Sequence, residues 1–301
     1  MEVRSKFDHT APGLALMQCH RQTGDPALLE AALNFAAYLA GFPQSRSGCP
    51  MHYLDAHLEL PPELPPGHPE FDQRHEARRQ ALAVTNAGPC IFVDSIHFHG
   101  PFLAALHAAT GERRWLEQAE ATIGPQVELL WDAPAGLFHH FFIEREQRPN
   151  GVHWGRGNGW ALLGLVDTLE QIPADRPLAA RFREIVNRQA ERFAALQDAS
   201  GDWHTVIDDP ASYLESSVAC FAMDGFGRAL RHGWLDARYR PMVERAWAAM
   251  LTHIRADGLF DGVSFETFPS TRAEFYRTMP RGAMVPWGQG PFLTACREYL
   301  R

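Results

Sequence analysis

Apolar residues along the chain recur mainly at helical spacing, and sustained alternation of apolar and polar residues is almost absent. The first such segment, residues 10–23, stops at Gly24, and Pro26 follows two residues later. Glycine commonly ends a helix and proline commonly opens one. This pattern predicts a helix over 10–23 and a second helix over about 26–41, joined by a short turn.

The same order of an apolar helix, a glycine break and a more amphipathic helix returns along the rest of the chain. Further helices are predicted over 94–110, 113–131, 157–171, 176–197, 212–232, 236–255 and 286–300. Such repeats are typical of stacked helical hairpins in which the first helix is buried and the second is half exposed. The sequence therefore predicts an all-α toroid, with an open helical solenoid as the alternative.

Three loops between the predicted hairpins are rich in aromatic residues, histidine and glycine: 132–156, 198–211 and 256–285. Because long loops recur at one point of each hairpin, we expect them to form a rim that carries the function. The segment 56–70 contains the proline-rich run LPPELPPGHP. We interpret the region around 56–88 as an insertion in a single domain spanning 1–301, because the hairpin pattern resumes after it.

The composition is that of an ordinary globular protein. Of the 301 residues, 46% are hydrophobic and 21% are charged, which excludes a disordered chain. The net charge of −8 disfavours nucleic acid and anionic membrane surfaces as partners. The N-terminal sequence lacks the pattern of a secretory signal, and there is no run of about 18 apolar residues that could span a membrane. We therefore expect a cytoplasmic location.

The cysteines and histidines form no recognisable metal-binding motif. The five cysteines are far apart, without a Cys-x-x-Cys pair. The 15 histidines are scattered and include no His-Glu-x-x-His motif. We therefore predict neither a metal site nor another cofactor.

Two aspartates stand at the starts of predicted apolar helices, where a charged residue requires a reason. Asp94 follows the apolar run 91–93, and Asp8 has the same placement one helix pair earlier. An aspartate at such a position commonly caps the first free N–H groups of the helix. The competing interpretation is a catalytic pair, because matched positions on successive inner helices point to the same rim of a toroid.

The segment VHWGRGNGW, at the start of another predicted helix, carries further candidates. Its three glycines alternate with Trp154, Arg156, Asn158 and Trp160, so that a ligand could approach the backbone closely. Tryptophan faces stack on sugar rings, and a forked guanidinium binds a carboxylate at two points. In the preceding loop, the turn GLFHH offers His140 to the same rim. The alternative is a tight turn whose tryptophans pack in the core.

An aspartate shortly before QTGD, followed by FVDSIHFHGPFLA, GLFHH, WGRGNGW, YLESSVAC and GQGPFLTA, makes six stretches in a fixed order. In these stretches the chain resembles the unsaturated glucuronyl and rhamnogalacturonyl hydrolases of glycoside hydrolase families 88 and 105, and more closely the second. The resemblance runs nearly end to end. It implies an (α/α)6 barrel, which agrees with the predicted hairpins.

The resemblance also implies roles for individual residues. Asp94 would be the general acid/base and Asp8 the second active-site carboxylate. Members of the family act on small lyase-generated oligosaccharides whose nonreducing end is a 4,5-unsaturated uronic acid, and they hydrate its C4=C5 bond. This chemistry requires an aspartic acid that is protonated near neutral pH, a state that burial and the like charge of Asp8 would favour. The pocket for the unsaturated sugar would be lined by His140, Trp154, Arg156 and Trp160.

The start of the chain departs from the family, because only seven residues precede Asp8. With nine long helices predicted, a closed barrel would lack about three N-terminal helices. The inner helices 10–23 and 286–300 would then each lose a neighbour, and exposed apolar surface of that kind favours association. We therefore predict that the chain either forms a homodimer across this gap or is poorly stable and weakly active. The side chains expected to face water are Leu14, Met17, Phe292 and Leu293.

Two other functions are compatible with the same toroid. An epimerase-like sugar enzyme would use histidines as proton-transfer bases, and the context of Asp94 and WGRGNGW argues against it. The second is a catalytically weak, carbohydrate-binding relative of the hydrolases.

Overall fold

The predicted second carboxylate, Asp8, and the proline-rich region 56–87 lie outside the part of the chain that the structure describes. No helix within the described part is long and apolar enough to cross a membrane. The computed structural model describes residues 11–54, 88–265, 267, 270–283 and 285–301.

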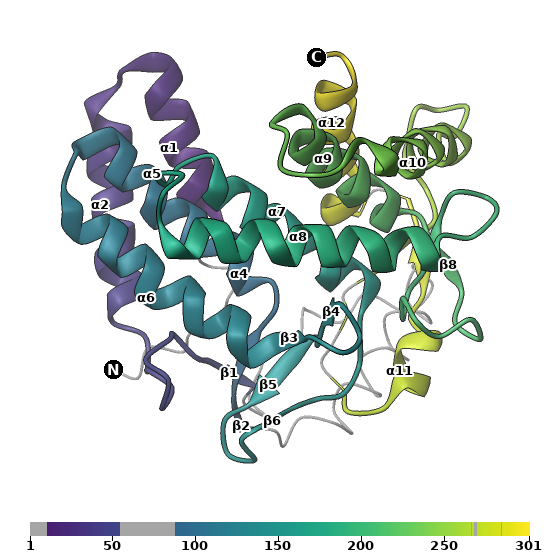
Figure 1. Cartoon of the computed structure of the whole chain (residues 1–301), viewed down its shortest axis with the longest axis horizontal. Helices are drawn as coiled ribbons and strands as arrows, with labels where there is room; N and C mark the ends of the chain where they lie inside the picture. Colours follow the sequence, from purple (N-terminus) through teal and green to yellow (C-terminus); the bar gives the residue numbers. More distant parts are fainter. Residues whose placement is uncertain (1–10, 55–87, 266, 268–269, 284) are drawn as a thin grey trace, which may run out of the picture.

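Each of the nine predicted long helices is present, and consecutive helices pack against each other in pairs (Figure 1). The first break shows why the pairs form. Gly24 adopts a φ of 69°, which glycine tolerates, and the Asp25 carboxylate accepts a hydrogen bond from the Ala27 N–H at 2.9 Å. The helices are α1 (Pro12–Thr23), α2 (Pro26–Ala40), α5 (Gly100–Thr110), α6 (Arg113–Leu130), α7 (Gly155–Leu169), α8 (Pro177–Leu196), α9 (Ser217–Arg231), α10 (Arg240–Thr252) and α12 (Pro286–Tyr299).

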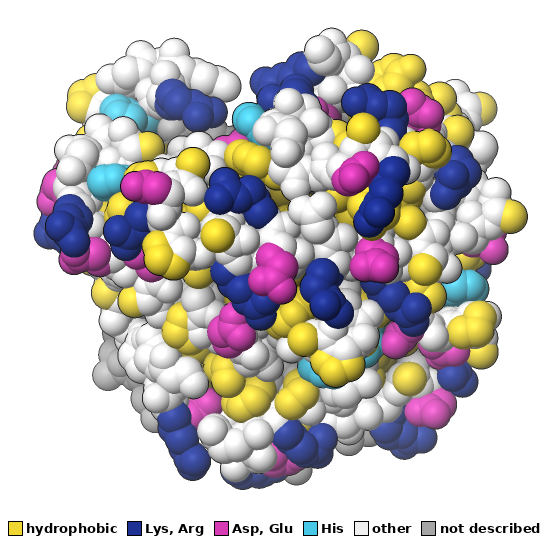
Figure 2. Space-filling view, viewed as in Figure 1, with side chains coloured by type: hydrophobic (Ala, Val, Ile, Leu, Met, Phe, Trp, Pro, Cys, Tyr) yellow, Lys and Arg dark blue, Asp and Glu magenta, His cyan; other side chains and the backbone are white. Residues whose placement is uncertain are grey.

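The core lies between the inner helices α5, α7 and α9. Every residue of α7 is buried except Trp160, and α5 and α9 are buried along most of their length. Their partners α6, α8 and α10 bury one stripe each and present charged residues to solvent, and Figure 2 shows cations and anions interspersed on the face that α8 crosses. The predicted contrast between inner and outer helices is thus confirmed for these three pairs. The pair α1 and α2 differs, since both helices are largely exposed.

Two predicted helices differ from the observed ones, one because it is broken and one because it starts later. The segment 94–110 forms two helices, α4 (Ser95–Phe98) and α5, which meet at His99. Pro101 accounts for the break, because proline has no N–H to donate to the carbonyl four residues earlier and its ring clashes there. The segment 212–232 becomes helical only at Ser217, because the preceding residues pair in a short strand ladder.

The predicted rim loops contain short antiparallel strands that the sequence pattern did not indicate. One sheet has the order β1-β2-β5-β6, and three further ladders pair β3 with β4, β7 with β8 and β9 with β10. These strands are two to five residues long, too short for apolar and polar residues to alternate visibly. The short helix α11 (Ala273–Arg277) is a further unpredicted element. The strands are β1 (His52–Leu54), β2 (Gly88–Phe92), β3 (Trp131–Asp132), β4 (Leu137–Phe138), β5 (Phe141–Ile143), β6 (Arg148–Pro149), β7 (Trp203–His204), β8 (Leu214–Glu215), β9 (Val263–Ser264) and β10 (Arg281–Gly282).

The apolar side chains expected to face water do so only in part. Met17 is 4% exposed, so the prediction is wrong for this residue, which packs in the core where α1 meets α2 and α5. Leu14 and Phe292 are partly buried against the same core. Leu293 is 65% exposed, as predicted.

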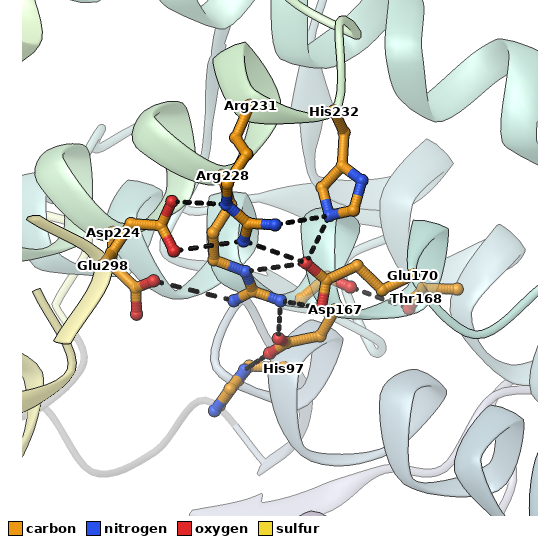
Figure 3. A network of polar contacts seen from close by, with 10 residues as sticks. His97, Asp167, Thr168, Glu170, Asp224, Arg228, Arg231, His232 and Glu298 are labelled. Carbon is orange, nitrogen blue, oxygen red and sulfur yellow. Dashed lines mark hydrogen bonds and ion pairs between the residues drawn. The ribbon is translucent and has the colours of Figure 1, made fainter. Parts of the chain in front are cut away.

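A network of charged side chains joins α7, α9 and α12 at the carboxyl end of α7 (Figure 3). Nη2 of Arg228 donates to Asp167 Oδ1 at 2.6 Å and to Glu170 Oε2 at 2.7 Å. On its other side, Asp167 Oδ2 lies 3.1 Å from His97 Nδ1 of α4. Burial alone would raise the pKa of Asp167, but the charge of Arg228 and the contacts with His97 lower it to about 2. This network fixes one end of α7, and the candidate site lies at the other.

Candidate active site

Asp94 lies between the end of β2 and the start of α4. Its side chain makes no capping hydrogen bond to the first turn of α4, so the capping interpretation does not apply to this residue. Asp94 is 5% exposed, and its charge acts on two buried neighbours, Arg156 and Tyr276. The structure therefore places this carboxyl group near side chains from two distant parts of the chain.

His140 lies next to Asp94, because the Val93 N–H donates to the His140 carbonyl at 2.9 Å. The His140 ring is 4.5 Å from the Trp154 ring between centroids, and its Nδ1 lies 2.6 Å from the Tyr276 hydroxyl. Burial, together with the charge of Arg156, lowers the pKa of His140 to about 3. The imidazole is therefore neutral over the physiological range, and the predicted site residues His140 and Trp154 form one wall.

Arg156 is 2% exposed and anchors the loop that follows β9 to the start of α7. Its Nη1 donates to Glu215 Oε1 at 3.1 Å and to the carbonyl and hydroxyl of Ser264 at 3.1 and 2.6 Å. Its Nη2 donates to the Phe265 carbonyl and the Thr267 hydroxyl, both at 3.0 Å. These contacts favour the reading in which Arg156 pairs with an internal acid, while binding of a substrate carboxylate by Arg156 stays a prediction.

The glycines of WGRGNGW allow close packing of helix α7. A Cβ at Gly157 would lie 2.7 Å from the Trp154 ring and 2.8 Å from Val93, and one at Gly159 would lie 2.5 Å from Phe221. Protein atoms, not a ligand, therefore occupy the space that these two glycines leave. Gly157 brings the start of α7 against Val93, the residue that precedes Asp94, and Gly159 brings it against Phe221 of α9.

Trp160 lies apart from the other predicted pocket residues. Its ring contacts His97 at 5.1 Å, Phe98 at 5.7 Å and Phe221 at 4.6 Å between centroids. These neighbours belong to α4 and α9, whereas Trp154 contacts His140 and the guanidinium of Arg156. The described contacts thus bring Asp94, His140, Trp154 and Arg156 together and place Trp160 in the packing between helices.

Three residues of this region were not predicted. Tyr276 orients His140, Glu215 pairs with Arg156, and Trp287 donates its indole N–H to the Ser264 carbonyl at 2.9 Å. Glu215 had a detectable signal, because it stands directly before an apolar helix, as Asp94 does. Tyr276 lies in α11, within the predicted loop 256–285, and Trp287 lies at the start of α12. No local sequence pattern indicates the contacts of either residue.

The described histidines are not all as scattered in space as they are in sequence. Asp132, His139 and His153 come together on the side of the rim that faces away from His140 and Trp154, with ligand-type atoms within 4.8 Å of one another. This group could hold a metal ion, although no spacing motif indicates it.

The geometry and the sequence point to the same family. The family model described as "Glycosyl Hydrolase Family 88" matches residues 2–301. The chain belongs to this family. Membership in Glycosyl Hydrolase Family 88 confirms the resemblance found in the sequence, makes the protein a glycoside hydrolase and argues against the epimerase-like alternative.

Relatives of this family 88 chain include enzymes of defined activity. It is 29% identical over 292 residues to the unsaturated rhamnogalacturonyl hydrolase YesR of Bacillus subtilis, covering 96% of this chain and 75% of the relative. It is 28% identical over 161 residues to an unsaturated 3S-rhamnoglycuronyl hydrolase of an Alteromonas species, covering 52% of this chain and 39% of the relative.

Superposition on a solved structure identifies the fold. A Salmonella enterica protein described as a possible GH105 member superimposes with a TM-score of 0.81 at 25% identity, over 97% of this chain and 71% of that protein. The chain therefore shares the (α/α)6-barrel fold of the family 88 and 105 enzymes, as the helical hairpins predicted.

Proposed function

We propose that the protein removes a 4,5-unsaturated uronic acid from the nonreducing end of lyase-generated oligosaccharides by hydrating its C4=C5 bond, with Asp94 as the general acid and base. The observation that carries the proposal is the buried carboxyl group of Asp94, which does not cap α4 and whose charge acts on the buried Tyr276 and Arg156. A carboxyl group that is protonated at the start of the reaction can act as its general acid.

The proposed reaction needs one proton donor and one water molecule. Protonated Asp94 donates its proton to C4 as the electrons of the double bond form the new C–H bond. Water adds to C5 and returns one proton to the Asp94 carboxylate. The resulting hemiketal at C5 opens the sugar ring, and C1, now a hemiacetal, becomes an aldehyde as the remaining sugar leaves with its oxygen protonated. Because the anomeric carbon is not attacked, the spacing of two carboxylates does not govern the outcome.

His140 would act as a neutral hydrogen-bond donor in this site. The Tyr276 hydroxyl accepts from Asn150 Nδ2 and the Ser270 N–H, both at 3.4 Å. Its own hydrogen can go to the Ser270 carbonyl at 3.3 Å or to His140 Nδ1 at 2.6 Å, and the shorter contact is the better hydrogen bond. His140 then carries its hydrogen on Nε2. A donor that stays uncharged can bind a sugar oxygen without opposing protonation of the neighbouring Asp94.

The substrate class we propose contains an unsaturated uronic acid linked to rhamnose. Support comes from the relatives, since YesR is an unsaturated rhamnogalacturonyl hydrolase and two others are unsaturated 3S-rhamnoglycuronyl hydrolases. The aromatic wall of Trp154 fits the apolar face of a sugar ring.

The test compares an unsaturated uronyl-rhamnose disaccharide with its saturated counterpart. We expect near-ultraviolet absorbance to fall with time for the unsaturated compound, together with release of rhamnose, and no cleavage of the saturated one. Equal cleavage of both compounds would contradict the proposal, because it would mean that the enzyme attacks the glycosidic bond itself.

A further inference from the structure

Two neighbouring segments carry side chains that make two separate sets of contacts. Residues 139–140 and 152–154 lie side by side, because the His140 N–H donates to the Val152 carbonyl at 2.9 Å. On one face the rings of His140 and Trp154 lie 4.5 Å apart and form the wall of the candidate active site. On the other face the rings of His139 and His153 stack at 4.7 Å with an angle of 20° between them. Neighbouring residues of each segment thus contribute to different ring contacts.

The second face gathers three ligand-type atoms around one point. Asp132 Oδ2 lies 3.3 Å from His153 Nε2 and 3.5 Å from His139 Nε2. Zinc binds imidazole nitrogen and carboxylate oxygen at about 2.0–2.2 Å, so neighbouring ligand atoms in a tetrahedral site are about 3.3 Å apart. Two of the three separations already match that value, and all three ligand atoms lie within 4.8 Å of one another.

Additional hydrogen bonds hold two of the three side chains in this orientation. His153 Nδ1 lies 2.7 Å from Asp208 Oδ2, so the carboxylate fixes the hydrogen on Nδ1 and leaves Nε2 as a lone-pair donor to a ligand. Asp132 Oδ1 accepts from the Ala135 N–H at 3.2 Å, which leaves Oδ2 to face the histidines. Pairing of a ligating histidine with a carboxylate is characteristic of metal sites.

The buried nitrogen of His153 supports a ligand in this position. The side chain of His153 is 10% exposed, and its Nε2 is buried with no hydrogen-bond partner among the described residues. An imidazole nitrogen binds a metal when it carries no hydrogen, and Nε2 of His153 is such a nitrogen when Asp208 holds the hydrogen on Nδ1.

We propose that Asp132, His139 and His153 bind one divalent transition-metal ion of the zinc type, with Asp208 orienting His153. The set of two imidazoles and one carboxylate leaves a fourth position for water. Because the ligands come from β3, from the residue after β4 and from the segment before α7, the ion would clamp these segments together. It would act from behind the wall of His140 and Trp154, as a structural ion outside the reaction.

The experiment uses untagged, full-length protein that has been treated with a chelator and dialysed. Titration with Zn²⁺ by calorimetry should show one site per chain, and titration with Co²⁺ should give the visible absorption of tetrahedral coordination. The melting temperature of the wild type should rise on addition of Zn²⁺. These readouts do not depend on glycosidase activity, so failure of the proposed function would leave them unchanged.

Three variants test whether the metal binds at this site and not at another histidine. His139→Gln should abolish stoichiometric binding, and Asp208→Asn should weaken it about 10- to 100-fold, the usual cost of losing such a partner. The control is His232→Gln, which removes a histidine 3.0 Å from a carboxylate, Glu170, where the described residues offer no second histidine ligand; it should bind as the wild type does. Circular dichroism of the metal-free variants checks folding. Absence of stoichiometric binding to the wild type, or equal binding by folded His139→Gln, would overturn the proposal.

Discussion

A buried arginine lies at each end of helix α7, and the two arginines have different surroundings. At the carboxyl end, Arg228 lies between Asp167 of α7 and Glu170, the residue that follows the helix, and also near Asp224, whose Oδ1 is 3.8 Å from Nη1 (Figure 3). At the amino end, Arg156 pairs with one carboxylate, Glu215, and otherwise donates to carbonyl and hydroxyl groups.

The comparison distinguishes charges that stabilise the fold, at the carboxyl end of α7, from a group proposed to exchange a proton, at the amino end. With a pKa of about 2, Asp167 stays ionised at neutral pH and is a poor general acid. At the amino end, the charge of the buried Asp94 acts on Tyr276 and on Arg156, and Arg156 is itself paired with Glu215. One end of α7 therefore fixes the fold, and the other holds the acid proposed to perform the reaction.

The largest expected effect is on the rate of Asp94→Asn. The amide keeps the shape of the side chain but cannot supply a proton, so kcat/KM should fall about 10²- to 10⁴-fold with little change in melting temperature. The matched control is Asp224→Asn, the same change at a buried acid near the carboxyl end of α7, which should keep most of the rate. Retention of more than half the rate by Asp94→Asn would show that Asp94 is not the general acid.

Asp167→Asn should instead reduce stability. Loss of one partner of a buried ion pair costs about 3–5 kcal/mol, and we expect the lower value because Glu170 remains bound to Arg228. The control is Asp257→Asn, which breaks the exposed pair with Arg255 and should cost about 1 kcal/mol or less. Urea unfolding of the three proteins gives the comparison.

The buried ion pair of Asp167 with Arg228 also predicts how stability depends on pH. The folded-state pKa of Asp167 is depressed to about 2, so its contribution is present above the unfolded value of about 3.9 and is lost as the pH falls through 2. The difference in stability between wild type and Asp167→Asn should therefore be constant from neutral pH to about pH 5 and shrink below about pH 4. A difference that stays constant down to pH 2 would contradict the prediction.

Arg156→Lys should lower stability more than it changes substrate binding. Lysine keeps the charge but loses the planar fork that reaches Glu215 and residues 264–267 together, which should cost about 1–3 kcal/mol. We expect a lower melting temperature and a KM close to that of the wild type. A raised KM with an unchanged melting temperature would make Arg156 a residue that binds the substrate's carboxylate.

The smallest effect is expected for Tyr276→Phe. Without the hydroxyl, His140 Nδ1 loses its partner at 2.6 Å, and the imidazole is no longer held in one tautomer. The rate should fall about tenfold, equivalent to about 1.4 kcal/mol, while KM changes less. An unchanged rate together with normal folding would show that Tyr276 does not position His140.

The helices could be predicted because their signals are local. Gly24 and Gly111 both adopt a positive φ, near 70°, at the ends of helices, and these glycines were visible in the sequence as breaks in the apolar pattern. The strands of the rim are too short to show a period, so the ladder between β7 and β8 was read as part of a loop and a helix. The helical period and the glycine breaks thus predicted the helices but not the short strands between them.

Three of the predicted site residues stand in separate motifs, each of which is recognisable within its own stretch of sequence. Asp94, His140 and Trp154 stand in motifs that resemble the family, and the structure brings them together. Tyr276 reaches His140 across 136 positions of the chain, and this long-range contact leaves no trace in either local sequence. The pairing of His139 with His153 was missed for the same reason, although both residues are next to predicted ones.

The most direct test of the account follows the reaction by proton NMR in deuterated water, using the unsaturated disaccharide with wild type and Asp94→Asn. Hydration predicts that the vinyl proton at C4 disappears, that deuterium enters C4, and that the remaining sugar is released at the same rate with wild type and far more slowly with the variant. Release of that sugar while the C4 vinyl signal persists would contradict the account, since it would show cleavage at the anomeric carbon.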